Sequence, residues 1–355
     1  MKKILIINPF GIGDVLFTTP LVRTLKDIFP QAGICYLANR RSAAVLADNP
    51  NIERVFIYER DEFQQIRNKS FFFWVKSNLA FLKQLKNEHF DIVFDFSLNS
   101  QYGFFSWYAG IKQRIGYDFK NRGRFLTKKI RLSGYRDKHI VEYYGDLMMS
   151  LNIELKHKDL ELYINKDDVE QANRLLEQKG IKDGELLVGV IPGAGRSWGK
   201  QASFKHWLPE RFAELSDKIV EKYKAKIIMM GDVFEKELSQ SVLSHMHQKA
   251  IDLTGSTSIG VLAALLKRMK LVITNDGGPL HMAVAVGTKT VSIFGPVSEA
   301  VYGPYPYSDK HIVVKADIGC RPCYKDFRIP PCESERICMQ GIDTDKVFSA
   351  VEKLL

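Results

Sequence analysis

The stretch KKILIINPFGIGDVLFTTP, residues 2–20, decides the fold of the N-terminal half. Its four successive apolar residues, 4–7, indicate a buried strand, and a helix pattern follows the turn. The turn is not a dinucleotide fingerprint, because Leu16 stands where the third glycine belongs. Gly13 lets a ligand approach the backbone, whereas the acid Asp14 repels phosphate. Asp14 is therefore either a helix cap or a general base presented at the strand end.

Strand and helix patterns alternate through the rest of the chain, which has 355 residues. This order predicts two doubly wound α/β domains, with parallel sheets and with ligands at the carboxyl ends of strands. Apolar strand patterns occupy residues 33–39, 54–60, 90–97, 186–195, 225–232, 270–278 and 289–296. We expect an N-terminal domain at 1–160, a C-terminal domain at 161–342, a crossing segment at 151–166, and a last helix at 343–355 that can pack back on the N-terminal domain.

The positive charge is concentrated in the first half of the chain. The formal net charge is +10, and residues 112–138 alone hold ten basic and two acidic side chains. Such a segment favours an anionic partner, namely nucleic acid, a membrane surface or a phosphorylated substrate, although a solvated loop has the same composition. No apolar run approaches the ~20 residues of a membrane span, and the N-terminus has the pattern of a first strand rather than of a signal peptide. We expect a cytoplasmic protein.

Two glycine turns of the second half carry charged side chains. In TNDGGPLHMAVAVG, residues 274–287, Asp276 ends a strand and a helix begins beside Pro279. The amides at that helix start suit a diphosphate, and His281 can donate to the same group or be an ordinary buried helix residue.

The other turn, IPGAGRSWGKQASFKHW at 191–207, is followed by Arg196, Lys200 and Lys205. Cations beside a glycine turn suit a leaving phosphate, whereas a surface loop with ordinary lysines is the alternative.

Three stretches, NPFGIGDVLFTTPLVRTLK, KHWLPERFAEL and VITNDGGPLHMAVAVGTKTVSIFGP, together resemble glycosyltransferase family 9, the bacterial ADP-heptose:lipopolysaccharide heptosyltransferases. The resemblance implies a GT-B fold, in which the N-terminal domain holds the acceptor, the C-terminal domain holds the nucleotide-sugar, and a cleft lies between them. It implies inverting transfer of a heptose from ADP-heptose to the inner core of lipopolysaccharide, without a cofactor or metal. It also implies peripheral association with the inner face of the inner membrane.

The resemblance assigns roles to individual residues. Asp14, in Gly-Asp-Val, resembles the general base, and Lys205 resembles the donor-binding lysine, although Lys200 is an alternative. Glu235 falls where the family holds the ribose, and Gly277 replaces a Ser or Thr that many members have. The implied donor-binding set is Gly193, Lys200, Lys205, Glu235, Asp276, Gly277, Gly278 and His281.

The basic segment then becomes the expected docking surface for an anionic lipopolysaccharide core. Arg23 and Arg40 assist if they reach the cleft. The helix pattern at 71–86 is either an interfacial contact with the membrane or an ordinary core helix. The implied acceptor-binding set is Gly13, Lys112, Arg114, Arg122 and Arg124.

Four cysteines near the C-terminus have the spacing C-x2-C-x8-C-x5-C; they are Cys320, Cys323, Cys332 and Cys338. They are either ligands of a structural zinc or reduced structural thiols, and we assign no metal. The Asp-x-Asp at 343–345 opens a helix pattern, so we interpret it as a helix cap rather than as a metal-diphosphate motif.

Two alternatives to heptosyl transfer remain at this point. One is transfer of a hexose or deoxysugar to another surface glycan by an enzyme of the same family. The other, from a different class, is a nucleic-acid-binding module, favoured by the basic segment and the cysteine-rich tail. The second alternative leaves the glycine turns at three strand ends without a role, and no nucleic-acid-binding motif is recognisable.

Overall fold

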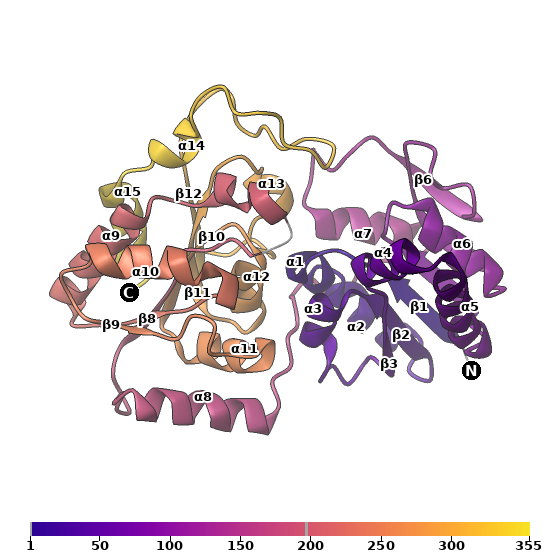
Figure 1. Cartoon of the computed structure of the whole chain (residues 1–355), viewed down its shortest axis with the longest axis horizontal. Helices are drawn as coiled ribbons and strands as arrows, with labels where there is room; N and C mark the ends of the chain where they lie inside the picture. Colours follow the sequence, from indigo (N-terminus) through magenta and orange to yellow (C-terminus); the bar gives the residue numbers. More distant parts are fainter. Residues whose placement is uncertain (1, 196–197) are drawn as a thin grey trace. The chain divides into compact units, whose positions relative to one another are not determined.

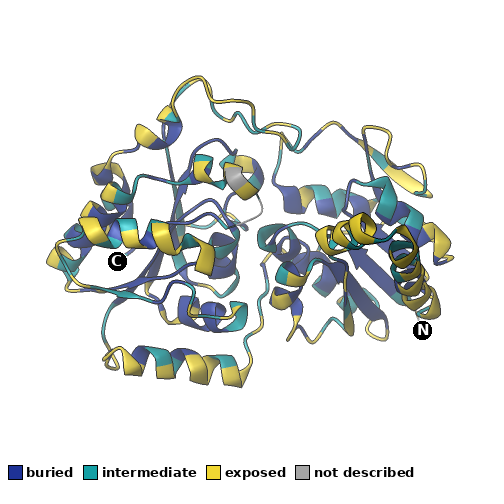
Figure 2. Cartoon of the chain, in the orientation of Figure 1, coloured by how far each residue is buried: buried dark blue, intermediate teal, exposed yellow. Residues whose placement is uncertain are grey.

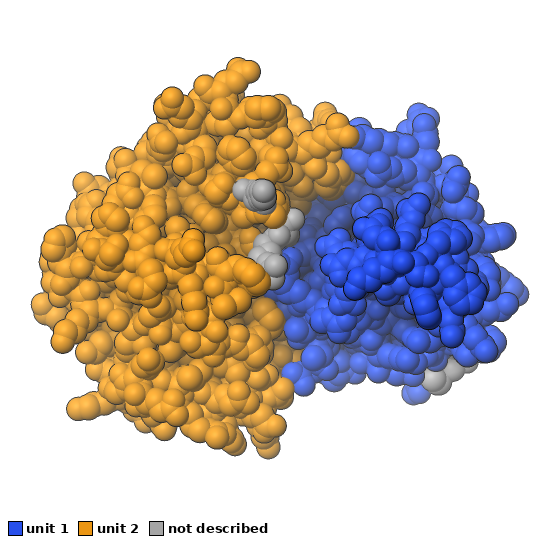
Figure 3. All heavy atoms as spheres, viewed as in Figure 1, with its two compact units in different colours: residues 1–135, 140–158 blue, residues 136–139, 159–355 orange. Residues whose placement is uncertain are grey.

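The computed structural model describes residues 2–195 and 198–355, and it divides into two compact units. Unit 1 comprises Met1–Tyr135 with Ile140–Lys158, and unit 2 comprises Arg136–His139 with Asp159–Leu355 (Figure 3). The division at 158/159 lies beside the expected boundary at 160/161, and the short segment 136–139 groups with unit 2.

Unit 1 is built on a six-stranded sheet with the order β3-β2-β1-β4-β5-β6, in which every pairing is parallel. The strand order reverses direction between β1 and β4, so the carboxyl ends of these two strands form the switch point at which such sheets bind ligands. The elements are β1 (Lys3–Ile7), α1 (Ile12–Leu16), α2 (Thr19–Ile28), β2 (Gly33–Ala38), α3 (Arg40–Ala43), η1 (Ala44–Leu46), β3 (Arg54–Ile57), α4 (Arg60–Lys69), α5 (Phe71–Asn87), β4 (Ile92–Asp95), α6 (Ser100–Tyr108), β5 (Gln113–Phe119), β6 (Lys128–Leu132) and α7 (Ile140–Met149).

Unit 2 repeats the same plan, again with parallel pairings and with helices on both faces of the sheet (Figure 1). Its strand order is β12-β11-β10-β7-β8-β9, so the switch point lies between β7 and β10. The elements are α8 (Lys166–Gln178), β7 (Leu187–Ile191), η2 (Gly199–Lys205), α9 (Pro209–Tyr223), β8 (Lys226–Met229), η3 (Val233–Glu235), α10 (Lys236–His245), β9 (Ala250–Asp252), α11 (Ile259–Arg268), β10 (Leu271–Asn275), α12 (Gly278–Ala285), β11 (Lys289–Phe294), α13 (Glu299–Tyr302), β12 (His311–Lys315), α14 (Ile337–Gln340) and α15 (Thr344–Glu352).

The central strands are apolar because both of their faces are covered. Residues 4–7 of β1 are fully buried, and β7 and β10 are buried along their whole lengths. Proline pre-sets the first turn of α9 at Pro209, and the left-handed backbone of the C-cap residue Lys224 terminates the helix after Tyr223. The predicted fold class of two doubly wound parallel sheets is confirmed.

The last helix, α15, belongs to unit 2. Val347, Val351 and Leu354 join the hydrophobic core of unit 2, in the same cluster as Trp207 and Phe212 of the α9 region. The apolar side of α15 therefore completes the unit that precedes it in the chain. The prediction of a helix cap is confirmed, because the Asp343 side chain accepts a hydrogen bond from the amide of residue 346 at 2.7 Å.

Candidate active site

The switch point of unit 2 brings together the glycine turn after β7 and the turn after β10. Asn275, the last residue of β10, is fully buried and joins the two turns. Its Nδ2 donates to the carbonyl oxygen of Pro192 at 2.6 Å, and its Oδ1 accepts from the amide of Trp207 at 3.2 Å. These bonds fix the backbone on both sides of the residues that carry charge.

A buried ion pair links those charged residues. The Lys205 Nζ lies 2.8 Å from Asp276 Oδ2, and the two residues are 7% and 4% exposed. The ammonium also lies 4.0 Å from the centre of the Trp198 ring, which adds a cation–π contact. A buried charge pair of this kind costs desolvation, so its place at a ligand-binding edge indicates a functional use. Trp198 could not be predicted as part of this site, since one tryptophan in a loop has no distinguishing sequence pattern.

The helix that starts beside this pair, α12, has no side chain capping its first turn. The residue before it, Gly277, has no room for a Cβ, which would lie 2.7 Å from the carbonyl oxygen of Ala194. This close approach of the two turns accounts for glycine at position 277. Gly278 begins the helix, so its amide lies at the positive end of the helix dipole.

His281 lies in the same helix and is buried. Its pKa is lowered to about 3, mainly by burial and also by the positive charges that His139 and Lys205 can carry nearby. The imidazole is therefore neutral at physiological pH and can donate one N–H, but it supplies no positive charge.

Glu235 connects the turns after β7 and β8. Its Oε1 accepts from the amide of Gly195 at 3.0 Å, and its Oε2 accepts from the amide of Asp232 at 2.8 Å. A Cβ on Gly193 would lie 1.9 Å from the same carboxylate. Both oxygens thus hold backbone in place, and Gly193 is needed for the close approach.

Of the two candidate phosphate-binding lysines, only Lys205 has a side chain among the described residues. Lys205 lies in the buried pair, whereas the side chain of Lys200 and the whole of Arg196 lie outside the described residues.

The switch point of unit 1 carries Asp14, in the first turn of α1. Asp14 is half-buried, and its Oδ2 accepts from the amide of Gly11 at 3.1 Å. The buried Asn8 donates from Nδ2 to the carbonyl oxygen of Asp14 at 2.9 Å. Gly13 precedes Asp14 in the same turn of helix. Asp14 is thus not the N-cap itself, which is Gly11; it is the third residue of the helix and its carboxylate bonds back to the N-cap amide. The carboxylate also lies where a ligand of this sheet would bind.

A second carboxylate at this switch point was missed. Asp95 ends β4, pairs in register with Ile7 of β1, and is buried. Burial raises its pKa to about 6, although its Oδ1 accepts from the amide of Ser97 at 2.9 Å. The signal was available, because an acid closing an apolar strand is a perturbed-pKa candidate.

The expected acceptor-binding cations lie at different ends of β5. Lys112 precedes the strand and Arg114 is its second residue, so both lie at the amino end. The Arg114 guanidinium donates to the carbonyl oxygens of Phe125, at 2.6 Å, and of Ile111. Arg122 follows the carboxyl end of β5 and is exposed.

The other expected cations have contacts on the surface of unit 1. The exposed Arg124 lies over the Phe125 ring, 4.7 Å from its centre. Arg40 pairs with Glu62 at 3.1 Å, and Arg23 is half-buried on α2.

The four cysteines line one cavity of about 280 Å³ in unit 2, together with Phe204 and Arg336. All are free thiols, and burial raises the pKa of Cys338 to about 11. Among the described residues, no three His, Cys, Asp or Glu side chains are arranged to hold a metal ion.

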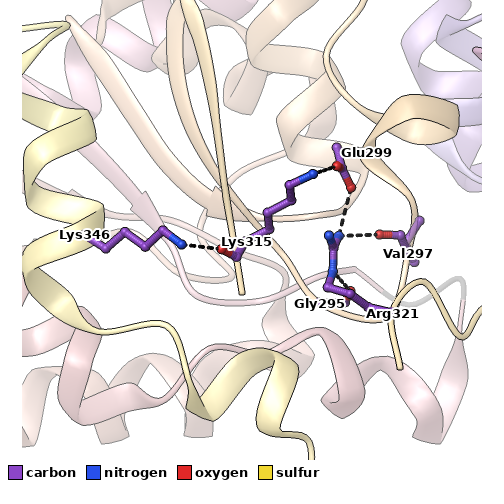
Figure 4. A network of polar contacts seen from close by, with 6 residues as sticks. All are labelled: Gly295, Val297, Glu299, Lys315, Arg321 and Lys346. Carbon is purple, nitrogen blue, oxygen red and sulfur yellow. Dashed lines mark hydrogen bonds and ion pairs between the residues drawn. The ribbon is translucent and has the colours of Figure 1, made fainter. Parts of the chain in front are cut away.

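Arg321 anchors this segment to the turn after β11 (Figure 4). Its guanidinium donates to the carbonyl oxygens of Gly295 at 3.0 Å and Val297 at 3.1 Å, and to Glu299 Oε2 at 2.8 Å. Lys315 also pairs with Glu299. The network explains how a loop with little regular structure is held against the sheet.

Comparison with known proteins shows which family this chain is similar to. The family model described as glycosyltransferase family 9 (heptosyltransferase) matches residues 78–331. Lipooligosaccharide heptosyltransferase 2 of Campylobacter jejuni is 26% identical over 357 residues, which cover 99% of this chain and 98% of the relative.

Solved structures show the same fold. A glycosyl transferase family 9 protein from Veillonella parvula aligns with a TM-score of 0.80 at 24% identity, covering 99% of this chain and 97% of that one. The ADP-heptose lps heptosyltransferase II of Escherichia coli aligns with a TM-score of 0.76 at 21% identity, covering 100% and 98%. The GT-B prediction is confirmed. No helix in the described part of the chain is long and apolar enough to cross a membrane.

Proposed function

The chain belongs to glycosyltransferase family 9, and we propose that it transfers a heptose from ADP-heptose to the inner core of lipopolysaccharide. It is a transferase, as its family and its curated relatives are. The observation that carries the donor assignment is the buried Lys205–Asp276 pair beside the start of α12, at a switch point. The name of the Escherichia coli structure includes ADP-heptose, which supports ADP as the nucleotide.

On the donor side, we propose that Lys205 and the first amides of α12 hold the diphosphate. Asp276 keeps the ammonium in place, and the Trp198 ring covers its other side. As the bond between the anomeric carbon and the phosphate oxygen breaks, negative charge develops on the departing ADP. Pre-positioned donors stabilise that charge without reorganising. Neutral His281 adds an N–H, and Glu235 acts by holding the glycine turns.

On the acceptor side, we propose Asp14 as the general base. A carboxylate at the carboxyl end of β1 can take the proton of an acceptor hydroxyl, whose oxygen then attacks the anomeric carbon. The new bond forms opposite the departing ADP, so the configuration inverts. The amide of Gly11 fixes one oxygen of Asp14, which orients the carboxylate.

We propose that this reaction proceeds without a metal ion, because Lys205 and the amides of α12 supply positive charge where the diphosphate would lie. Transfer measured after extensive treatment with EDTA should equal transfer in the untreated enzyme. Loss of transfer with EDTA, restored by a divalent cation, would contradict the proposal.

We further propose that the enzyme works at the cytoplasmic face of the inner membrane. The acceptor is a lipid-linked glycan with carboxylates and phosphates, and the basic side chains of unit 1 complement it. Arg122 fits this role better than Lys112, because Arg122 follows the carboxyl end of its strand.

The test combines nucleotide binding with transfer. ADP, UDP, GDP, CMP and dTDP are compared for the rise in melting temperature that they produce, and heptose transfer from ADP-heptose to an inner-core oligosaccharide is followed by mass spectrometry. We expect ADP to stabilise the wild type and the D14N variant equally, with transfer lost only in D14N. ADP should stabilise D276A much less.

Each other outcome has a defined meaning. Greater stabilisation by UDP or dTDP would replace the heptose assignment with the other-sugar alternative. If no nucleotide stabilises the protein, the donor site is wrong, and a salt-dependent gel shift with DNA would test the nucleic-acid-binding alternative. Undiminished heptose transfer by D14N would contradict the proposal that Asp14 is the general base.

A further inference from the structure

Helix α5 of unit 1 presents apolar side chains to solvent as well as to the core. Phe81, Leu82 and Leu85 pack in the core cluster, whereas Phe72 is 72% exposed and Leu79 is 49% exposed. Figure 2 shows the outer side of this helix in the colour of exposed residues. An ordinary surface helix has a polar outer face, so the exposed aromatic and aliphatic groups require a partner.

Lysines alternate with these apolar groups on the outer side of α5. Phe72, Lys76, Leu79 and Lys83 are spaced at i, i+4, i+7 and i+11, so they form one stripe along the helix. The helix contains three lysines and no acidic residue. Its start is defined by Ser70, whose Oγ accepts from the amide of residue 73 at 3.4 Å.

The end of α6 extends this stripe. Helices α5 and α6 share the core cluster through Leu85 and Phe105, and Trp107 of α6 is 52% exposed. Lys86 lies 5.8 Å from the centre of the Tyr108 ring, so the two helices also meet at the surface. We define the α5–α6 face as Phe72, Lys76, Leu79, Lys83, Trp107 and Tyr108.

The composition of this face distinguishes between possible partners. The core of a protein interface is depleted in lysine, whereas lysine stems can lie along an apolar surface while the ammonium reaches phosphate. Tryptophan and tyrosine are enriched at the level of lipid headgroups. The absence of acids on α5 matches an anionic surface. No described helix can cross a membrane, so the contact would be interfacial.

We propose that the α5–α6 face lies on an anionic lipid bilayer, with Phe72, Leu79 and Trp107 at headgroup depth and the lysines against lipid phosphates. The inference rests on the proposed function, since a lipid-linked acceptor is reached from the membrane surface. It names a contact in unit 1 that is separate from Asp14 and from the donor-binding residues. The bilayer contact would raise the local concentration of acceptor without taking part in the chemistry.

The test is sedimentation of the full-length protein with vesicles of phosphatidylcholine, alone or mixed with phosphatidylglycerol, at low and high salt. We expect binding to the anionic vesicles that weakens with salt. The F72S/L79S double variant should lower the partition coefficient about ten- to a hundred-fold, because less apolar surface leaves water. K76E/K83E should abolish the dependence on phosphatidylglycerol. The matched control is Y307S, which removes an aromatic side chain that is 91% exposed in unit 2.

Two further readouts separate this proposal from the proposed function. ADP stabilisation, and transfer to an acceptor freed of its acyl chains, should be unchanged in F72S/L79S. If those assays fail in the wild type while vesicle binding persists, the proposed function falls and the membrane contact stands. The membrane contact is overturned if the wild type ignores anionic vesicles, if F72S/L79S binds them equally well, or if light scattering shows a dimer that this variant dissociates.

Discussion

The buried carboxyl group of Asp95 allows a quantitative test of the switch point in unit 1. Asp95 is 5% exposed, and burial raises its pKa to about 6 from an ordinary value of 3.8. The perturbation is D95N, which keeps the shape of the side chain and an oxygen that can accept from the amide of Ser97. Asparagine does not ionise, so the variant removes the electrostatic cost of the buried charge and little else.

The sign and size of the effect follow from proton linkage. A raised pKa means that the folded protein binds the Asp95 proton more tightly than the unfolded chain does. The stabilisation from this proton is therefore complete below pH 4 and is lost as the pH rises to about 6. A shift of about two units corresponds to about 3 kcal/mol. Relative to the wild type, D95N should thus gain about 2.5 kcal/mol of unfolding free energy between pH 4 and pH 7, because a small part of the effect already falls below pH 4.

Urea denaturation of the wild type and D95N across this pH range measures that gain. The matched control is D118N, on the neighbouring strand β5. There, the hydrogen bond from the amide of Gly123 lowers the pKa of Asp118, with a smaller contribution from Lys129. The stability difference between D118N and the wild type should therefore change with pH in the opposite direction. A difference for D95N that stays constant from pH 4 to pH 7 would refute the reasoning.

Three more predictions concern the donor site, the cysteines and the acceptor surface. K205M and D276L should each lower the free energy of unfolding, measured by urea denaturation, by about 3–5 kcal/mol, because each leaves the partner's charge buried and unpaired. The double variant should lose clearly less than the sum of the two. Strictly additive losses would argue against the ion pair. Cys338, whose pKa is raised to about 11, should be alkylated at pH 8 about a hundred-fold more slowly than an exposed thiol. Above pH 8 the alkylation rate, followed by peptide mapping, should rise about tenfold per pH unit. A rate that does not depend on pH would contradict this prediction. R122E should raise the KM for the acceptor several-fold and K112E should not; equal effects would place the acceptor elsewhere.

The parallel sheets could be predicted because their central strands have a direct sequence signal. Strands covered on both faces, such as β1, β7 and β10, are continuous apolar runs that end at glycine turns. Once the order of strands is known, the switch points follow, and so does the meeting of Lys205 with Asp276 across 71 residues of chain. The family resemblance added roles that spacing alone does not supply.

Other features depended on packing that the sequence does not display. The apolar side of α15 fits either unit equally well as a pattern, and only the core around Trp207 decides its place. An aromatic side chain in an amphipathic helix is usually expected to be buried, yet Phe72 is exposed. Hydrophobic periodicity alone does not show which apolar side chains find room in the core. The support that Glu235 gives to two glycine turns is likewise a long-range contact.

The two switch points share a strand order and a buried asparagine, yet they differ in charge. In unit 1, Asn8 holds the turn that carries Asp14, and a second carboxylate, Asp95, ends the neighbouring strand β4. In unit 2, Asn275 holds a turn at which the charge of Asp276 is balanced by a lysine and faces the start of α12. The first arrangement suits a substrate hydroxyl that gives up a proton to a carboxylate, and the second suits an anionic ligand such as a diphosphate. A transfer reaction needs both, so one fold used twice can supply opposite electrostatics through the few residues that follow equivalent strands.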